Sequence, residues 1–215
     1  MRERIKGSIK EHKVIAIVRG IKPELCVKTA QALYDGGVRL MEITYDQRHP
    51  ESWEETAATI GAVAKAFAGK MYIGAGTVTC TELVELTHKV GGQFVISPDV
   101  NEAVIRRTVE LGMVSIPGAM TPTEIMTAHR AGADFVKLFP AGSLGVGYMK
   151  AVKAPVSHVD LLVVGGIDEK NAAEYMAAGA AGVGIGGSLA KREWAESGEF
   201  EKITEAARQI VAAVG

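Results

Sequence analysis

One lysine of this chain lies within a short apolar segment, where a charged side chain is unusual. The segment reads Phe135-Val136-Lys137-Leu138-Phe139. In an extended strand alternate side chains share a face, so Phe135, Lys137 and Phe139 are expected on one side. Burial disfavours the ammonium and lowers a lysine pKa, and the neutral amine forms Schiff bases with carbonyl compounds. We predict that Lys137 is a catalytic nucleophile. The alternative is a lysine that reaches solvent or pairs with an acid.

An acid occupies a similar position in a second apolar segment, residues 40–44. Alternation places Glu42 and Thr44 on the same face of that segment. A carboxyl group with a raised pKa can transfer the protons that carbinolamine formation, dehydration and enamine formation require. The alternative role for Glu42 is a structural ion pair with Lys137 or Arg19, because buried charges are generally paired.

The elements that would position these groups follow an alternating pattern. Apolar, strand-like segments are predicted at 14–18, 40–44, 71–74, 94–96, 114–116, 135–138, 161–164 and 183–185. Helical patterns lie between them, near 23–35, 51–67, 80–90, 101–111, 122–131, 147–153, 169–178 and 199–213. Strand-then-helix alternation of this kind indicates parallel strands joined by crossover helices.

Eight such units within 215 residues favour an α/β (β/α)8 TIM barrel that occupies residues 1–215 as a single domain. A doubly wound open sheet is the alternative. The turn after the first strand, residues 19–23, lacks the G-x-G-x-x-G phosphate-binding pattern, which disfavours that alternative.

In a barrel, functional side chains gather at the carboxyl ends of the strands. The side chains predicted there are Arg19, Glu42, Thr44, Thr77, Pro98, Lys137 and Phe139. The last two strands end in glycine-rich turns, whose amide groups can approach an anion closely. We therefore predict a phosphate site at Gly165, Gly166, Gly186, Gly187 and Ser188, the loops where barrels often bind phosphate.

The overall composition disfavours several classes of partner. A formal net charge of -1, from 24 basic and 25 acidic residues, predicts no attraction to nucleic acid or to an anionic membrane. No apolar stretch has the length of a membrane span, and the charged residues 1–12 do not resemble a signal peptide. The two cysteines, Cys26 and Cys80, fit a reducing cytoplasm. Glu85 and His88 have a helical metal-ligand spacing, but a solvated helix face explains them better, and we expect neither metal nor other cofactor.

Several motifs together resemble the KDPG/KHG aldolases, which are lysine-dependent (class I) aldolases. The similarity runs in order from about residue 12 to residue 190. The motifs are Val18-Arg19-Gly20, Met41-Glu42-Ile43-Thr44, Gly74-Ala75-Gly76-Thr77-Val78-Thr79, Ile96-Ser97-Pro98, Pro117-Gly118-Ala119-Met120-Thr121-Pro122-Thr123-Glu124, Lys137-Leu138-Phe139-Pro140-Ala141 and Gly165-Gly166-Ile167.

The resemblance implies a role for each matching position. Lys137 matches the Schiff-base lysine and Glu42 the general acid/base, while Thr77 matches the hydroxyl that contacts the pyruvyl carboxylate. Arg19 matches a first-strand arginine, and the glycine turns match the phosphate site. The resemblance also implies a homotrimer, with a 2-keto-3-deoxy sugar acid phosphate and pyruvate as small-molecule partners.

Two departures affect the expected substrate. Asp46 stands where many members have an arginine that binds the substrate carboxylate. Arg19 and Arg48 are the candidates to take over that role. Val164 replaces a common threonine next to the phosphate turn, as in the related galactonate-type aldolases. We expect cleavage of 2-keto-3-deoxy-6-phosphogluconate to pyruvate and glyceraldehyde 3-phosphate, together with 4-hydroxy-2-oxoglutarate cleavage. The alternatives are the phosphogalactonate epimer, a phosphate-binding barrel without covalent catalysis, and a non-catalytic sugar-acid-binding protein.

Overall fold

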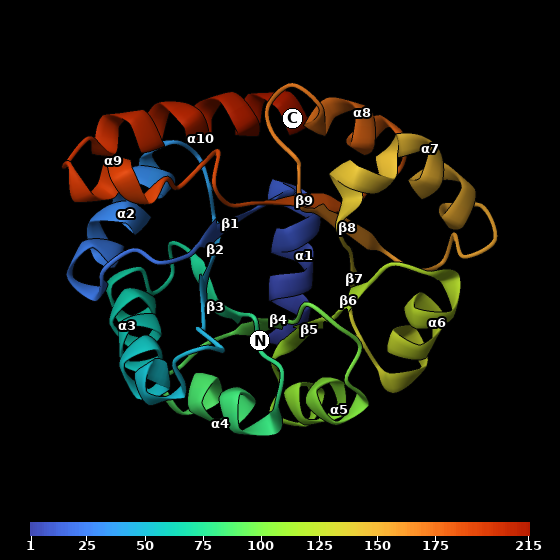
Figure 1. Cartoon of the computed structure of the whole chain (residues 1–215), viewed down its shortest axis with the longest axis horizontal. Helices are drawn as coiled ribbons and strands as arrows, with labels where there is room; N and C mark the ends of the chain where they lie inside the picture. The colour runs from blue at the N-terminus through green and yellow to red at the C-terminus, as the bar shows by residue number, and fades with distance from the viewer.

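A ring of parallel strands surrounded by helices is the central feature of the computed structural model, which describes residues 1–215 (Figure 1). Every strand pairing is parallel. The strands are β1 Val14–Val18, β2 Leu40–Thr44, β3 Tyr72–Gly76, β4 Phe94–Ile96, β5 Val114–Ile116, β6 Gly118–Ala119, β7 Val136–Leu138, β8 Leu161–Val164 and β9 Gly182–Ile185.

The predicted barrel is confirmed, although its fifth strand is divided in two. β5 pairs with β4 and β6 pairs with β7, and only Pro117 separates the two pieces. Proline has no N–H to donate, which explains the interruption of the ladder. The carbonyl of Pro117 still accepts a hydrogen bond from the Lys137 amide at 2.8 Å, so this divided strand connects both edges of the sheet.

The helices agree with the sequence prediction at most positions. They are α1 Arg2–His12, α2 Pro23–Asp35, the 3-10 helix η1 Pro50–Ser52, α3 Trp53–Ala66, α4 Thr81–Lys89, α5 Glu102–Glu110, α6 Pro122–Ala131, α7 Ala141–Lys153, α8 Ala172–Ala177, α9 Arg192–Glu196 and α10 Phe200–Val214. None of them combines the length and the apolar composition that crossing a membrane would require.

Three helical features differ from the prediction. α1 and the short α9 were not expected, and α7 begins at Ala141 rather than near residue 147. Glycine has low helix propensity, which hid the first turns of α7, and the backbone is non-helical at Gly145. Only two large apolar side chains of α1, Ile5 and Ile9, are buried, so the hydrophobic periodicity of this segment is weak.

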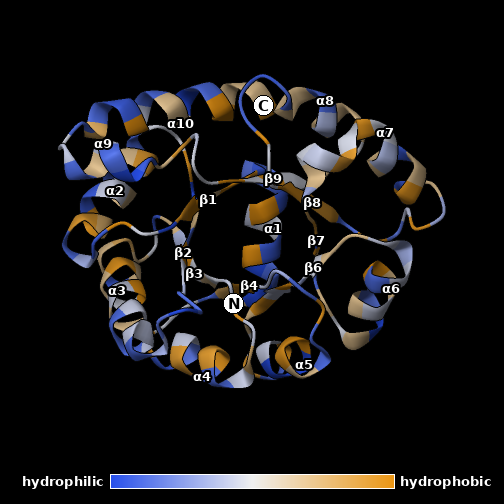
Figure 2. Ribbon diagram, viewed as in Figure 1, coloured by the Kyte–Doolittle hydropathy of each residue, from blue (hydrophilic) through white to orange (hydrophobic).

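The core has two regions, one outside and one inside the ring. Outside, buried apolar side chains fill the space between strands and helices. Inside, Ile5 and Ile9 of α1 pack with strand residues such as Leu40, Phe94 and Phe135. Figure 2 shows hydrophobic and hydrophilic residues side by side on α1, which lies in the centre of the ring in this view. One end of the barrel is thereby filled with side chains.

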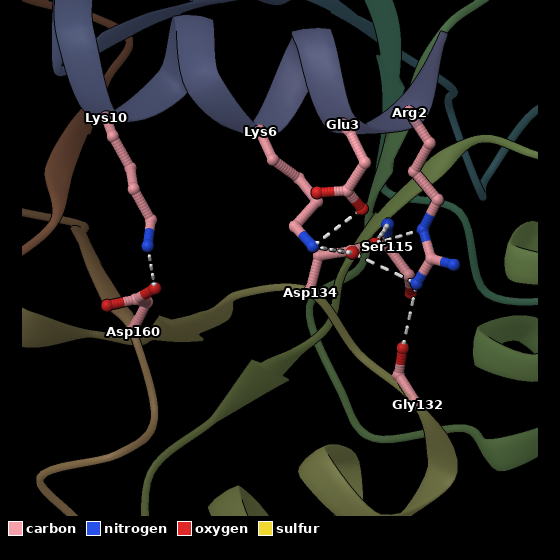
Figure 3. Close-up of polar contacts among 8 residues, drawn as sticks. All are labelled: Arg2, Glu3, Lys6, Lys10, Ser115, Gly132, Asp134 and Asp160. Carbon is pink, nitrogen blue, oxygen red and sulfur yellow. Dashed lines mark hydrogen bonds and ion pairs between the residues drawn. The ribbon is translucent and has the colours of Figure 1, made fainter.

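A buried carboxylate fastens α1 to the barrel. The Asp134 side chain is 2% exposed and lies 2.9 Å from Arg2, measured from Oδ1 to Nη2. Its Oδ2 accepts a hydrogen bond from the Ser115 amide at 3.0 Å, and Lys6 lies 3.7 Å away (Figure 3). Asp134 immediately precedes the segment that contains Lys137, so these contacts connect α1 to that strand.

We predict that Asp134→Ala lowers the free energy of unfolding by about 2–4 kcal/mol, because it leaves a buried amide and partly buried Arg2 without their acceptor. Urea unfolding followed by circular dichroism measures the change. The matched control is Asp160→Ala, which removes a more exposed pair with Lys10 and should cost at most about 1 kcal/mol. Equal effects of the two substitutions would contradict the prediction.

Candidate active site

A cavity of about 590 Å³ opens at the carboxyl ends of the strands. It is lined from several strands at once, as barrel topology predicts. Its lining residues are Ile17, Arg19, Glu42, Thr77, Pro98, Lys137, Phe139, Val164, Gly165, Gly166, Ile167, Asp168, Gly184, Gly186, Gly187 and Ser188.

Lys137 reaches this cavity from β7. Lys137 is 8% exposed, and in the strand ladder it is aligned with Gly118 of β6 on one side and Leu162 of β8 on the other. Burial lowers the pKa of Lys137, the negative charge of Glu42 opposes that shift, and the positive charge of Arg19 adds to it. The Lys137 Nζ lies 4.7 Å from the centre of the Phe139 ring, a distance at which an aromatic face attracts a cation. The Phe139 face favours the cation, but the effect of burial is larger and leaves the pKa lowered, so the neutral, nucleophilic amine is more accessible here than in water.

Glu42 reaches the same cavity from β2 and is 2% exposed. Burial raises the pKa of Glu42 to about 7, although the positive charges of Lys137 and Arg19 act in the opposite direction. Its Oε2 is buried and has no hydrogen-bond partner in the protein. A carboxyl group in this state can both give and take a proton near neutral pH, and it has a free oxygen to do so.

Gly76 provides the space that Glu42 occupies. A Cβ built on Gly76 would lie 1.4 Å from Oε2 of Glu42, which no side chain could tolerate without moving the carboxyl group. We therefore predict that Gly76→Ala lowers kcat about 10–100-fold by displacing the acid, in keeping with the sensitivity of rate to small misplacements. Steady-state kinetics test this. Gly147→Ala is the control, since a Cβ there meets nothing within 4 Å, and an equal loss in both variants would contradict the prediction.

Thr77 and Arg19 form one wall of this cavity. Thr77 has a backbone φ of 57°, a left-handed conformation that is rare for a β-branched residue and costs about 1–3 kcal/mol. Arg19 Nη2 donates a hydrogen bond to Thr77 Oγ1 at 3.4 Å. A guanidinium beside a hydroxyl can bind a carboxylate.

The glycine turns line the same cavity and carry amide donors that the backbone does not use. The amide groups of Gly166, Gly187 and Ser188 donate no backbone hydrogen bond. The first turn is itself held in place, because Gly142 donates from its amide to the Gly165 carbonyl at 2.7 Å and Asn171 donates to the Gly166 carbonyl at 2.9 Å. Free amides that line one cavity can bind an anionic group.

The structure brings together every predicted site residue except one. Thr44 lines a neighbouring cavity of about 600 Å³, and its hydroxyl donates to the Val18 carbonyl at 3.4 Å. Arg48 also lines only that neighbouring cavity, so Arg19 is the arginine that the structure places beside Lys137. Ile17, Ile167 and Asp168 also line the cavity and were not predicted from the sequence. Side-chain alternation from Ile15 along the first strand could have predicted Ile17. Ile167 and Asp168 follow a turn, where alternation gives no prediction.

No group of three His, Cys, Asp or Glu side chains is arranged to hold a metal ion. Glu85, one of the residues with metal-ligand spacing, pairs with Arg107 on the helix surface.

A model of one protein family, described as KDPG and KHG aldolase, matches residues 5–206. The chain belongs to the KDPG and KHG aldolase family. This family member is 42% identical over 182 residues to the probable 2-dehydro-3-deoxy-6-phosphogalactonate aldolase of Rhizobium meliloti, with 84% of this chain and 83% of that protein covered. It is 38% identical over 177 residues to the corresponding Escherichia coli aldolase, with 82% and 83% covered. The 2-dehydro-3-deoxy-phosphogluconate aldolase of Treponema pallidum is 33% identical over 205 residues, covering 94% of each chain.

Solved structures of aldolases share the fold of this family member. The structure entitled "Native KDPGal structure" is 36% identical, has a TM-score of 0.84 and covers 93% of each chain. A KDPG aldolase from Legionella pneumophila, with pyruvate captured as a covalent carbinolamine intermediate, is 25% identical. Its TM-score is 0.85, with 95% of this chain and 97% of that chain covered. Together with the family match, these relatives identify the chain as an aldolase, a lyase.

Proposed function

We propose that this aldolase cleaves a 2-keto-3-deoxy-6-phospho sugar acid through a Schiff base on Lys137. The observation that supports this most directly is the presence of buried Lys137 and the unpartnered Oε2 of Glu42 in one cavity. The amide donors of the glycine turns lie in the same cavity and suit the phosphate end of such a substrate. Arg19 and Thr77 suit its carboxylate end.

The reaction begins when the neutral amine of Lys137 attacks the C2 ketone and forms a carbinolamine. Glu42 in its acid form protonates the departing hydroxyl, which leaves as water and gives a cationic iminium. The face of the Phe139 ring, 4.7 Å from Nζ, stabilises positive charge at this nitrogen.

The iminium then accepts the electron pair of the C3–C4 bond. The C4 hydroxyl gives its proton to the Glu42 carboxylate, the C3–C4 bond breaks, and glyceraldehyde 3-phosphate leaves. Glu42 returns that proton to C3 of the enamine, and water hydrolyses the resulting imine to pyruvate and free Lys137. Hydrolysis of the iminium releases one proton, which the Glu42 carboxylate takes up. Glu42 therefore gives two protons and accepts two in each cycle, and it ends as the acid with which it began.

Among substrates, the comparisons favour the galactonate-type epimer. The two relatives named for 2-dehydro-3-deoxy-6-phosphogalactonate are 38% and 42% identical to this chain, against 33% for the phosphogluconate aldolase of Treponema pallidum. Val164, which the family resemblance associates with galactonate-type aldolases, lines the cavity and lies with Ile17 beside Gly184. The gluconate epimer, ranked first from sequence alone, and 4-hydroxy-2-oxoglutarate are the second and third candidates.

The decisive experiment combines covalent trapping with kinetics. Pyruvate and borohydride should add one reduced pyruvyl group to the protein, detected by intact mass and located on Lys137 by peptide mapping. Coupling pyruvate release to lactate dehydrogenase then compares kcat/KM for the two C4 epimers and for 4-hydroxy-2-oxoglutarate. Trapping without turnover of any of the three would contradict the proposed substrates, and turnover without trapping would contradict the Schiff base. A non-catalytic sugar-acid-binding protein is expected to show neither covalent trapping nor turnover.

A homotrimer in the cytoplasm, implied by the family resemblance and the cysteine content, stays a prediction. Both cysteines are free, Cys26 being buried and Cys80 partly buried. Light scattering coupled to size exclusion measures the oligomeric state.

A further inference from the structure

We infer that Gln47 is a positioning residue that holds Thr77 in the backbone conformation required to bind the substrate carboxylate. The inference rests on the proposed function, because it assigns that carboxylate to the wall formed by Thr77 and Arg19. Gln47 itself lies in the neighbouring cavity and does not line the one that contains Lys137. It would therefore act through Thr77 and not by touching the reacting atoms.

Thr77 needs an external restraint because its conformation is unfavourable. Apart from Lys13 beyond the end of α1, it is the only residue other than glycine with a positive φ in the chain. Residues held in such regions persist when the surrounding structure determines their conformation, and they concentrate at functional sites. Thr77 follows β3 directly and lines both cavities, so its orientation decides which groups face the substrate.

The two ends of the Gln47 amide bind the residues on either side of Val78. Gln47 Nε2 donates to the Thr77 carbonyl at 2.8 Å, and Gln47 Oε1 accepts from the Thr79 hydroxyl at 2.8 Å. Val78 is held separately, since its amide donates to Ile96 and its carbonyl accepts from the Ser97 hydroxyl at 2.6 Å. The turn is thus fixed from the loop after β2 and from β4 with its following loop.

This restraint leaves the useful donors of Thr77 free. Its carbonyl is occupied by Gln47, whereas its amide donates no hydrogen bond and its hydroxyl contacts only Arg19. An amide, a hydroxyl and a guanidinium are then available as donors for one carboxylate, and charge-assisted hydrogen bonds of this kind are strong. Releasing the Thr77 carbonyl would remove a restraint on the backbone of Thr77, which could then leave its unfavourable conformation and take its amide and hydroxyl with it.

The loop that carries Gln47 is itself held in place by other hydrogen bonds. The preceding residue, Asp46, accepts from the Trp53 indole at 2.9 Å through its carbonyl and from the Arg48 amide at 2.8 Å through its side chain. The loop after β2 is therefore ordered by bonds that do not involve Gln47. Substituting Gln47 should alter the Thr77 turn while leaving its own loop in place.

The test is Gln47→Glu, which preserves size and the acceptor for Thr79 but replaces the donor to Thr77 with an oxygen. We expect about a tenfold rise in KM, and the same rise in the pyruvate concentration that gives half-maximal borohydride inactivation, with kcat within about twofold of wild type. Gln47→Met removes both bonds without adding charge and should show the same pattern. His49→Gln is the control on the same loop, because its exposed side chain contacts only Glu51, and its KM should stay within about twofold.

The outcomes separate this inference from the proposed function. If wild-type protein is not trapped by pyruvate, the Schiff-base proposal fails before Gln47 is tested. If wild type is trapped but Gln47→Glu and Gln47→Met keep the wild-type KM, the positioning role is wrong. Loss of thermal stability with unchanged KM, or a fall in kcat alone, would likewise show a structural role and overturn the inference. If either Gln47→Glu or Gln47→Met fails to fold, the KM of the other variant decides the test.

Discussion

Lys137→Arg abolishes both aldol cleavage and pyruvate trapping, with kcat lowered by at least about 10⁴-fold. The physical reason is that a guanidinium stays protonated under all conditions that a protein tolerates, so it never offers the neutral nitrogen that imine formation requires. In wild type, burial of Lys137 lowers its pKa and makes that neutral form available. The measurement is pyruvate release, together with intact mass after borohydride reduction.

Because arginine is larger than lysine, a second variant protects this prediction against misfolding. Lys137→Met removes the charge at nearly constant length and replaces a buried amine with an apolar side chain, which the surrounding core should accept. Both variants should give the circular dichroism spectrum of wild type. A folded Lys137→Met protein that still cleaves substrate would show that another group forms the imine or that none is needed.

Glu42→Gln lowers kcat by about 10²–10⁴-fold, the usual contribution of one positioned proton-transfer group. Glutamine has the size and the hydrogen-bonding oxygen of glutamic acid but neither gives nor takes the required proton. Because burial raises the pKa of Glu42 to about 7, wild-type activity should change slope near pH 7, with the acid form dominant below it and the carboxylate above. Rate measurements from pH 5 to pH 9 should find that inflection in wild type and not in Glu42→Gln.

Two results would contradict that role. Full activity in Glu42→Gln would leave Glu42 with only a structural part beside Lys137. An inflection near pH 7 that survives the substitution would assign the titration to another group. Glu42→Asp is a useful companion, because it keeps the acid and withdraws it by one methylene, so it should recover part of the rate if proton transfer is the function.

Periodicity in the sequence was sufficient to predict the barrel and the interior position of the two buried charged residues. Side chains alternate strictly along a strand, so Lys137 had to share a face with Phe135, and Glu42 with Leu40. Both pairs do face the interior of the ring. The strand bounds of 14–18, 40–44, 94–96, 114–116 and 161–164 were also correct, because each is a short apolar segment between turn signals.

The same reasoning failed where a chain leaves its strand. Alternation placed Thr44 with Glu42, yet Thr44 is the last residue of β2 and lines the neighbouring cavity. Arg48, four residues further on, follows the loop into that cavity as well. The direction of a side chain beyond a strand depends on the loop backbone, which no two-residue period describes.

Residue types, spacing and strand periodicity by themselves determined the fold class, the presence of a lysine and an acid in one cavity, and the glycine turns that line it. Only the tertiary structure decided that α1 fastens to Asp134, that Gly76 makes room for Glu42, and that Gln47 holds Thr77. Each of these contacts joins residues at least 30 positions apart: 30 for Gln47 and Thr77, 34 for Glu42 and Gly76, and 132 for Arg2 and Asp134. Local sequence rules act over a turn or a strand, and contacts at such separations exist only after loops of particular length and conformation have brought their ends together.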